Sequence, residues 1–166
     1  MREPSLRDQD HFSFLHVEHT LGRGPAAWDD PVMERLWRYN LHYFDDLNAA
    51  GHAQRATAHR ALVARWIAEN PPGHGTGWEP YPTSLRIANW IKWFVAGAPA
   101  EPAWLDSLAV QVRWLTRRIE WHLLGNHLFV NAKALVMAGL FFDGEEAGFW
   151  LRRGLAILQR ELPEQI

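Results

Sequence analysis

An amide and an imidazole lie side by side where a helix is expected to begin, because Asn126 and His127 follow Gly125. A helix start presents unpaired backbone N–H groups and the positive end of the helix dipole, so it suits an anion such as a sugar carboxylate. Asn131, four residues after His127, shares its helix face. The structural alternative is that Gly125 ends one helix and Asn126 caps the next. Spacing alone favours the cap.

A second candidate site combines a proline-rich loop with the helix that follows it. The prolines would hold Trp78 and Tyr81 in fixed directions, and Arg86, Asn89 and Trp90 share one helical face. Arginine can pair with a carboxylate through two hydrogen bonds, and a tryptophan ring can cover a sugar ring. Tryptophan packing, with Arg86 bonded to loop carbonyls, accounts for the pattern equally well.

Other constellations are weaker. Tyr39 and Tyr43 share a face of an expected helix, where packing is the better explanation. His11, His16 and His19 lie in an irregular segment without a carboxylate at ligand spacing, so no metal site is expected. No phosphate-binding loop or nucleophile elbow is present, and no cofactor is expected.

Apolar periodicity predicts six helices, preceded by an irregular segment over residues 1–30 with a short strand at 11–15. Asp30 is expected to cap the first helix, and Thr83 or Ser84 the third, which Gly97 ends. The other expected ranges are 31–47, 52–69, 102–122, 127–142 and 145–162. Short connections predict three antiparallel hairpins in an all-α domain over residues 31–166. No closing cap follows the last helix, so a domain truncated at its C-terminus is expected.

Composition indicates one soluble globular domain, with 48% hydrophobic and 22% charged residues in a chain of 166. A net charge of −2 without a basic run argues against nucleic acid or a membrane as partner. The ten tryptophans imply dense packing or a lining for flat ligands. The charged N-terminus does not look like a signal peptide, which predicts a cytoplasmic protein unless Met1 is not the native start.

Several strings, in this order, resemble the N-terminal domain of heparinase II/III-like polysaccharide lyases. They are WRYNLHYF at 37–44, NPP at 70–72, GWEPYPTSLRIANW at 77–90 and GNHLFVNAKAL at 125–135. The similarity extends from about Trp28 to Ile166. It implies an incomplete α/α toroid, followed in full-length members by the rest of the toroid and a β-sandwich domain. It also implies β-elimination of an acidic, uronate-containing polysaccharide, and a periplasmic or secreted protein if a leader precedes Met1.

The resemblance assigns roles to individual residues. Asn126 and His127 are implied to neutralise the uronate carboxylate, which now favours function over a plain cap at Asn126. The residues implied to line the substrate subsites are Trp78, Tyr81, Arg86, Asn89, Trp90 and Asn131. The proton-transferring Tyr and His of the family are expected beyond Ile166, so this chain alone is expected to be inactive. The other possibility is a non-catalytic carbohydrate-binding or scaffolding domain. Alginate, heparan-type, hyaluronan-type and bacterial exopolysaccharide substrates all fit.

Overall fold

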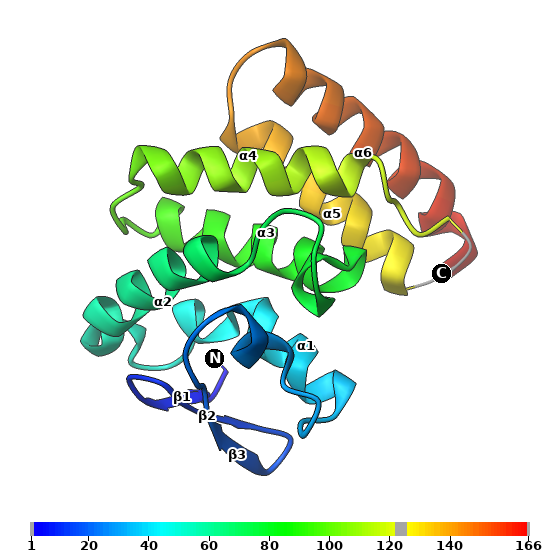
Figure 1. The fold of residues 1–166 in the computed structure, drawn as a ribbon. Helices are drawn as coiled ribbons and strands as arrows, with labels where there is room; N and C mark the ends of the chain where they lie inside the picture. Colours follow the sequence, from blue (N-terminus) through cyan, green and yellow to red (C-terminus); the bar gives the residue numbers. More distant parts are fainter. Residues whose placement is uncertain (1, 122–125, 166) are drawn as a thin grey trace.

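The computed structural model describes residues 2–121 and 126–165, and it shows a mostly helical chain with a small N-terminal sheet (Figure 1). Within these residues six α-helices follow one another. They are α1 (Arg35–Tyr43), α2 (Ala56–Glu69), α3 (Pro80–Val95), α4 (Pro102–Thr116), α5 (Asn126–Phe141) and α6 (Glu145–Gln165). Short 3-10 helices precede or link them at Pro25–Asp29, Asp45–Asn48, His52–Arg55 and Thr76–Trp78. The expected mostly α fold with an N-terminal β segment is confirmed.

The N-terminal segment is more regular than its sequence suggests. Strands β1 (Leu6–Asp8), β2 (His11–Phe14) and β3 (Val17–Thr20) form an antiparallel sheet in sequence order. A two-residue turn joins β2 to β3, and its residues Leu15 and His16 have φ angles of 54° and 64°. Hairpins with this geometry usually carry Asn or Gly, so the turn gave no sequence signal. Three strands thus replace much of the irregular structure expected over residues 1–30.

The odd-numbered helices pack against one another. Helix α3 lies between α1 and α5, while α4 packs on α3 and α6 packs along α5. Helices α1, α3 and α5 all begin on the right-hand side of Figure 1, so their N-terminal ends face the same edge of the molecule. Among the helices described, none is long and apolar enough to cross a lipid bilayer.

The starts of α1, α2 and α3 differ from the predicted ones. Helix α2 begins at Ala56, after a 3-10 helix over His52–Arg55. Asp30 begins a turn, with its carboxylate accepting from the backbone N–H of Val32, but α1 starts only at Arg35. It ends early because Phe44 adopts a left-handed conformation. Helix α3 starts at Pro80, before the expected cap at Thr83 or Ser84, because proline is tolerated in the first turn of a helix.

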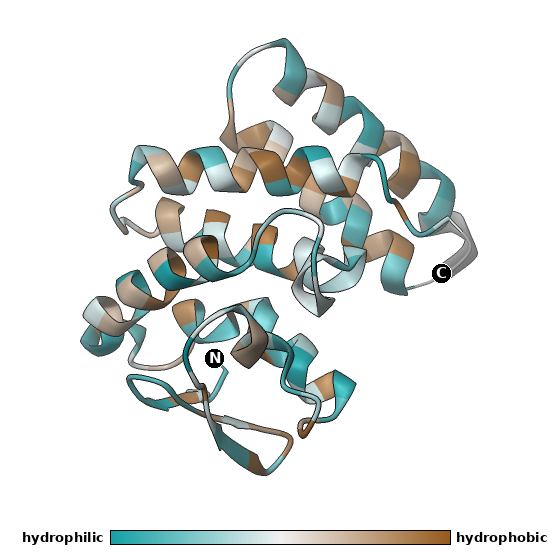
Figure 2. Cartoon of the chain, in the orientation of Figure 1, coloured by the Kyte–Doolittle hydropathy of each residue, from teal (hydrophilic) through white to brown (hydrophobic). Residues whose placement is uncertain are grey.

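Aromatic residues form the centre of the core. Trp28, Trp66 and Trp90 have no exposed surface, and Trp78 is 3% exposed. The rings of Trp78 and Trp90 lie 5.7 and 5.8 Å from that of Trp66, and Phe44 contacts Trp66 and Trp90 edge-on. Hydrophobic bands alternate with hydrophilic ones along the helices (Figure 2). This packing holds α3 against α1 and α2. The first turn of α3 carries part of the candidate site.

Candidate functional site

Asn126 and His127 are the first two residues of α5, and both side chains reach the surface. Asn126 is exposed, and the His127 side chain retains 39% of its accessible surface. Neither is sealed in the core. Gly125, expected to end the preceding helix, lies outside the described residues. The first turn of α5 therefore brings an amide and an imidazole to the edge where α1 and α3 also begin.

The imidazole of His127 is held between two neighbours. The ring centroid of Tyr81, in the first turn of α3, lies 4.4 Å from that of His127. The Oε2 atom of Glu120 lies 3.3 Å from Nδ1 of His127. Tyr81 is partly exposed, and Glu120 keeps 12% of its side-chain surface. Tyr81, Asn126 and His127 are therefore the predicted site residues that the fold brings together at the surface.

A chain of tyrosines continues from His127 toward α1. The Tyr43 ring lies 6.1 Å from Tyr81 and 6.5 Å from Tyr39, whose hydroxyl donates to the Glu79 carboxylate. Burial and this hydrogen bond raise the pKa of Tyr39 to about 12. Burial also raises the pKa of Tyr43. Both phenols therefore stay protonated near neutral pH and are poor proton acceptors.

The remaining predicted subsite residues are buried. Trp78, Arg86, Asn89, Trp90 and Asn131 are at most 4% exposed. Their polar groups bond mostly within the protein: Asn89 donates to the Tyr43 carbonyl at 2.9 Å, and Trp78 to the Asn70 carbonyl at 3.2 Å. In the structure these five side chains pack inside the protein. Their direct contact with a substrate stays a prediction.

Arg86 shows how the loop before α3 is held. Its guanidinium donates to Gly77 O at 2.7 Å and Gln111 Oε1 at 2.8 Å, and lies 3.9 Å above the Trp66 ring. Burial holds the pKa of Arg86 well below its usual value. Gly77 also lies so close to His42 that a larger residue would clash there: a Cβ at Gly77 would lie 2.5 Å from the His42 ring.

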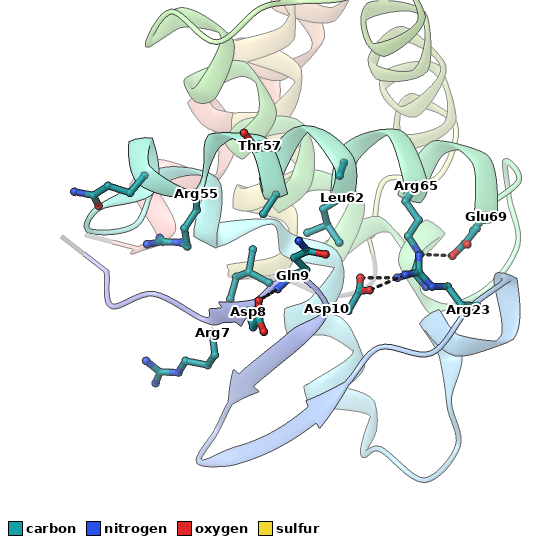
Figure 3. Close-up of a pocket in the computed structure, with 14 residues that line it drawn as sticks. Arg7, Asp8, Gln9, Asp10, Arg23, Arg55, Thr57, Leu62, Arg65 and Glu69 are labelled. Atoms are coloured by element: carbon teal, nitrogen blue, oxygen red, sulfur yellow. Dashed lines mark hydrogen bonds and ion pairs between the residues drawn. The ribbon is translucent and has the colours of Figure 1, made fainter.

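A separate cavity of about 570 Å³ lies between β1 and α2 (Figure 3). Two of its arginines are paired inside it: Arg65 bonds Asp10 at 2.7 Å and Glu69 at 2.9 Å, and Arg23 lies 3.3 Å from Asp10. The elements that form it carry none of the predicted site residues. We therefore place the candidate site at the starts of α3 and α5 rather than in this cavity.

The N-terminal histidines make local contacts. His11 bonds Thr20 and Glu18, and His19 lies 3.5 Å from Asp30. Within the described part of the chain, no group of three or more His, Cys, Asp or Glu side chains lies close enough to hold a metal ion.

Sequence reasoning missed Glu120. The sequence predicts a helix over residues 102–122, which would place Glu120 within that helix. In the structure α4 ends at Thr116, and residues 117–121 turn back toward α5. The only usable signal was the carboxylate itself, seven residues before a candidate site histidine.

Fold and site together define a helical domain that presents donor groups at the shared edge of its odd-numbered helices. Residues 25–166 match the family model described as Heparinase II/III N-terminus, and the chain belongs to this family. The match indicates the N-terminal domain of a heparinase II/III-like lyase. No curated protein and no solved structure matches the chain.

Proposed function

We propose that this domain supplies the carboxylate-neutralising part of a polysaccharide lyase that cleaves uronate-containing chains by β-elimination. The observation that carries the proposal is the pair at the start of α5, exposed Asn126 and partly exposed His127, in a chain whose family is that of heparinase II/III-like lyases. The substrate is an acidic polysaccharide or oligosaccharide.

The chemistry explains why such a pair is needed. The reaction removes the proton on the carbon beside the uronate carboxylate and expels the 4-linked sugar, leaving an unsaturated ring. That proton is far too weakly acidic while the carboxylate keeps its full charge. Donors on the carboxylate stabilise the negative charge that develops on its oxygens as the proton leaves. The Asn126 amide, the His127 ring and the N–H groups in the first turn of α5 supply such donors.

The groups that move protons are proposed to lie in the remainder of the toroid. Burial raises the pKa of both Tyr39 and Tyr43, which disfavours the ionised form that a base needs. The 166 residues alone are therefore expected to give no turnover. The test follows the ultraviolet absorbance of the unsaturated uronate product, with and without the following domains. Robust turnover by the 166 residues alone would contradict the proposal that the proton-transferring groups lie outside them.

Two substitutions of Asn126 separate carboxylate binding from helix capping. Aspartate caps a helix as well as asparagine does and suits the positive end of its dipole, so Asn126→Asp should keep the melting temperature. The same change places a negative charge against the substrate carboxylate, so kcat/KM should fall further than in Asn126→Ala. If Asn126 is only a cap, Asn126→Ala should be less stable and both variants should stay active.

The substrate class is tested with a panel of alginate, heparan-type, hyaluronan-type and bacterial exopolysaccharide chains. A lyase releases unsaturated product from at least one of them. Binding without product, in a protein that includes the remainder of the toroid, would instead establish a non-catalytic carbohydrate-binding domain.

A further inference from the structure

We propose that Glu120 is a positioning residue for His127: it fixes the ring nitrogen that carries hydrogen and turns the other nitrogen toward the substrate. The inference rests on the proposed function, because it gives Glu120 a part in how His127 meets the uronate carboxylate. Glu120 itself does not touch the substrate in this arrangement.

The contact between the two side chains sets the tautomer. Oε2 of Glu120 lies 3.3 Å from Nδ1 of His127. An ionised carboxylate only accepts hydrogen bonds, so Nδ1 must be the donor and carry a hydrogen. With 12% of the Glu120 side chain exposed, little water competes for this bond. We assign the other ring nitrogen, Nε2, to the contact with the substrate.

Glu120 is itself held in place by Asn131. The Asn131 amide donates to Oε2 of Glu120 at 3.3 Å and to the Ser84 hydroxyl at 3.0 Å, while its oxygen accepts from the Glu120 backbone N–H at 3.0 Å. Asn131 and Ser84 are fully buried. Three elements (α3, α5 and the segment after α4) thus fix the carboxylate, and a carboxylate held this way can orient a ring.

Tyr81 completes the support of the imidazole. Its ring lies 4.4 Å from that of His127 with a tilt of 38°, so it limits rotation of the ring plane while Glu120 limits its direction. In a charged ring both nitrogens carry hydrogen, so with Nδ1 bonded to Glu120 it is Nε2 that would donate to the substrate carboxylate beside the Asn126 amide. A ring free to rotate would not hold its N–H against the carboxylate, which is why orientation matters for catalysis.

The first measurement is the tautomer of His127 by ¹⁵N NMR of the imidazole signals, assigned by comparison with His127→Gln. The wild-type chain should show a protonated Nδ1. Glu120→Leu should shift hydrogen toward Nε2, whereas Glu120→Gln keeps an acceptor and should retain part of the wild-type signal. Glu146→Gln is the matched control, because Glu146 pairs with Arg113 at an exposed site and should leave the His127 signals unchanged.

The second measurement is kcat/KM of the lyase containing this domain, with melting temperatures recorded alongside. Glu120→Leu should lower kcat/KM about tenfold or more, as loss of a group that orients a ligand commonly does, and Glu120→Gln should restore part of it. An unchanged tautomer with a lower melting temperature would overturn the proposal, since Glu120 would then be structural only. An altered tautomer with normal turnover would overturn the role given to His127. Full turnover in Asn126→Ala as well would instead reject the proposed function itself.

Discussion

Arg86 places a guanidinium in the core, and no carboxylate of the residues that the structure describes pairs with it. Carbonyl and amide oxygens receive its hydrogen bonds, and the Trp66 and Trp78 rings lie 3.9 and 5.8 Å from its carbon Cζ. A buried cation is costly unless such groups replace its water. Because one of those oxygens belongs to Gly77, the arginine ties the loop before Tyr81 to the core.

Arg86→Met is expected to lower the free energy of unfolding by about 3 kcal/mol, because it leaves several buried acceptors unpaired. Arg118→Met is the matched control: Arg118 also lies over an indole, 3.8 Å from the Trp114 ring, but it is exposed and should lose less than about 1 kcal/mol. Urea unfolding measures both. Equal losses in the two variants would show that the buried acceptors do not matter.

His42 makes stability depend on pH. Burial, followed by the charge of Arg86, lowers the pKa of His42 to about 3, and the neutral ring accepts from Trp66 Nε1 at 3.0 Å. The unfolded chain binds a proton near pH 6.5, whereas the folded chain does not until about pH 3. Stability is therefore fully present above about pH 6.5 and declines as pH falls through this window, by up to about 1.4 kcal/mol per pH unit.

Urea unfolding of wild type and His42→Gln across this pH range checks that slope. The variant should be less stable at neutral pH, since it loses the indole and backbone contacts of the ring, but its curve should be flatter. Parallel curves would mean that other groups cause the decline.

At the scale of elements, Asp46 joins the N-terminal sheet to the helices. Its carboxylate accepts from the backbone N–H groups of Ser5 and Leu6 at 2.7 and 3.0 Å, and from Arg55 and His59 at 2.7 Å each. Burial alone would raise the pKa of Asp46, but the hydrogen bonds from His59, Arg55 and the backbone outweigh it and lower it. This buried carboxylate thus ties the start of the sheet to the helices.

Asp46→Asn should cost about 1–3 kcal/mol at neutral pH, because the amide turns a donor toward other donors. A lowered carboxyl pKa contributes stability above its unfolded value near 4 and loses it as pH falls further, so the difference from wild type should narrow below about pH 4. Asp106→Asn, on the exposed face of α4, is the control and should match wild type. A constant difference at every pH would exclude the charge as the cause.

The sequence predicts the helices themselves better than it predicts where they begin and end. Helices with apolar faces were found by periodicity, since burial of one face imposes a period of 3.6 residues. Their ends were harder, because Pro80 starts a helix as readily as it breaks one, and the left-handed Phe44 has no sequence signature. The candidate site could also be predicted only in part. A sequence motif indicates Asn126 and His127 at the start of α5, whereas Glu120 reaches His127 only through the turn after α4.

For the molecule as a whole, a formal net charge of −2 offers no general attraction for an acidic polysaccharide. Any attraction must be local, from the shared edge where α1, α3 and α5 begin and from His127. Such exposed charge interactions are screened over about 8–10 Å at physiological salt.

Binding of an acidic oligosaccharide should therefore weaken as ionic strength rises from roughly 0.05 to 0.5 M, because salt screens the positive ends of the helix dipoles. Isothermal titration of the lyase containing this domain measures the Kd at each salt concentration. The matched ligand is the same oligosaccharide with its uronate carboxyls reduced to alcohols. It should bind more weakly and with little dependence on salt, since only stacking and hydroxyl contacts remain. Equal affinity for both ligands at low salt would show that the edge does not recognise the carboxylate.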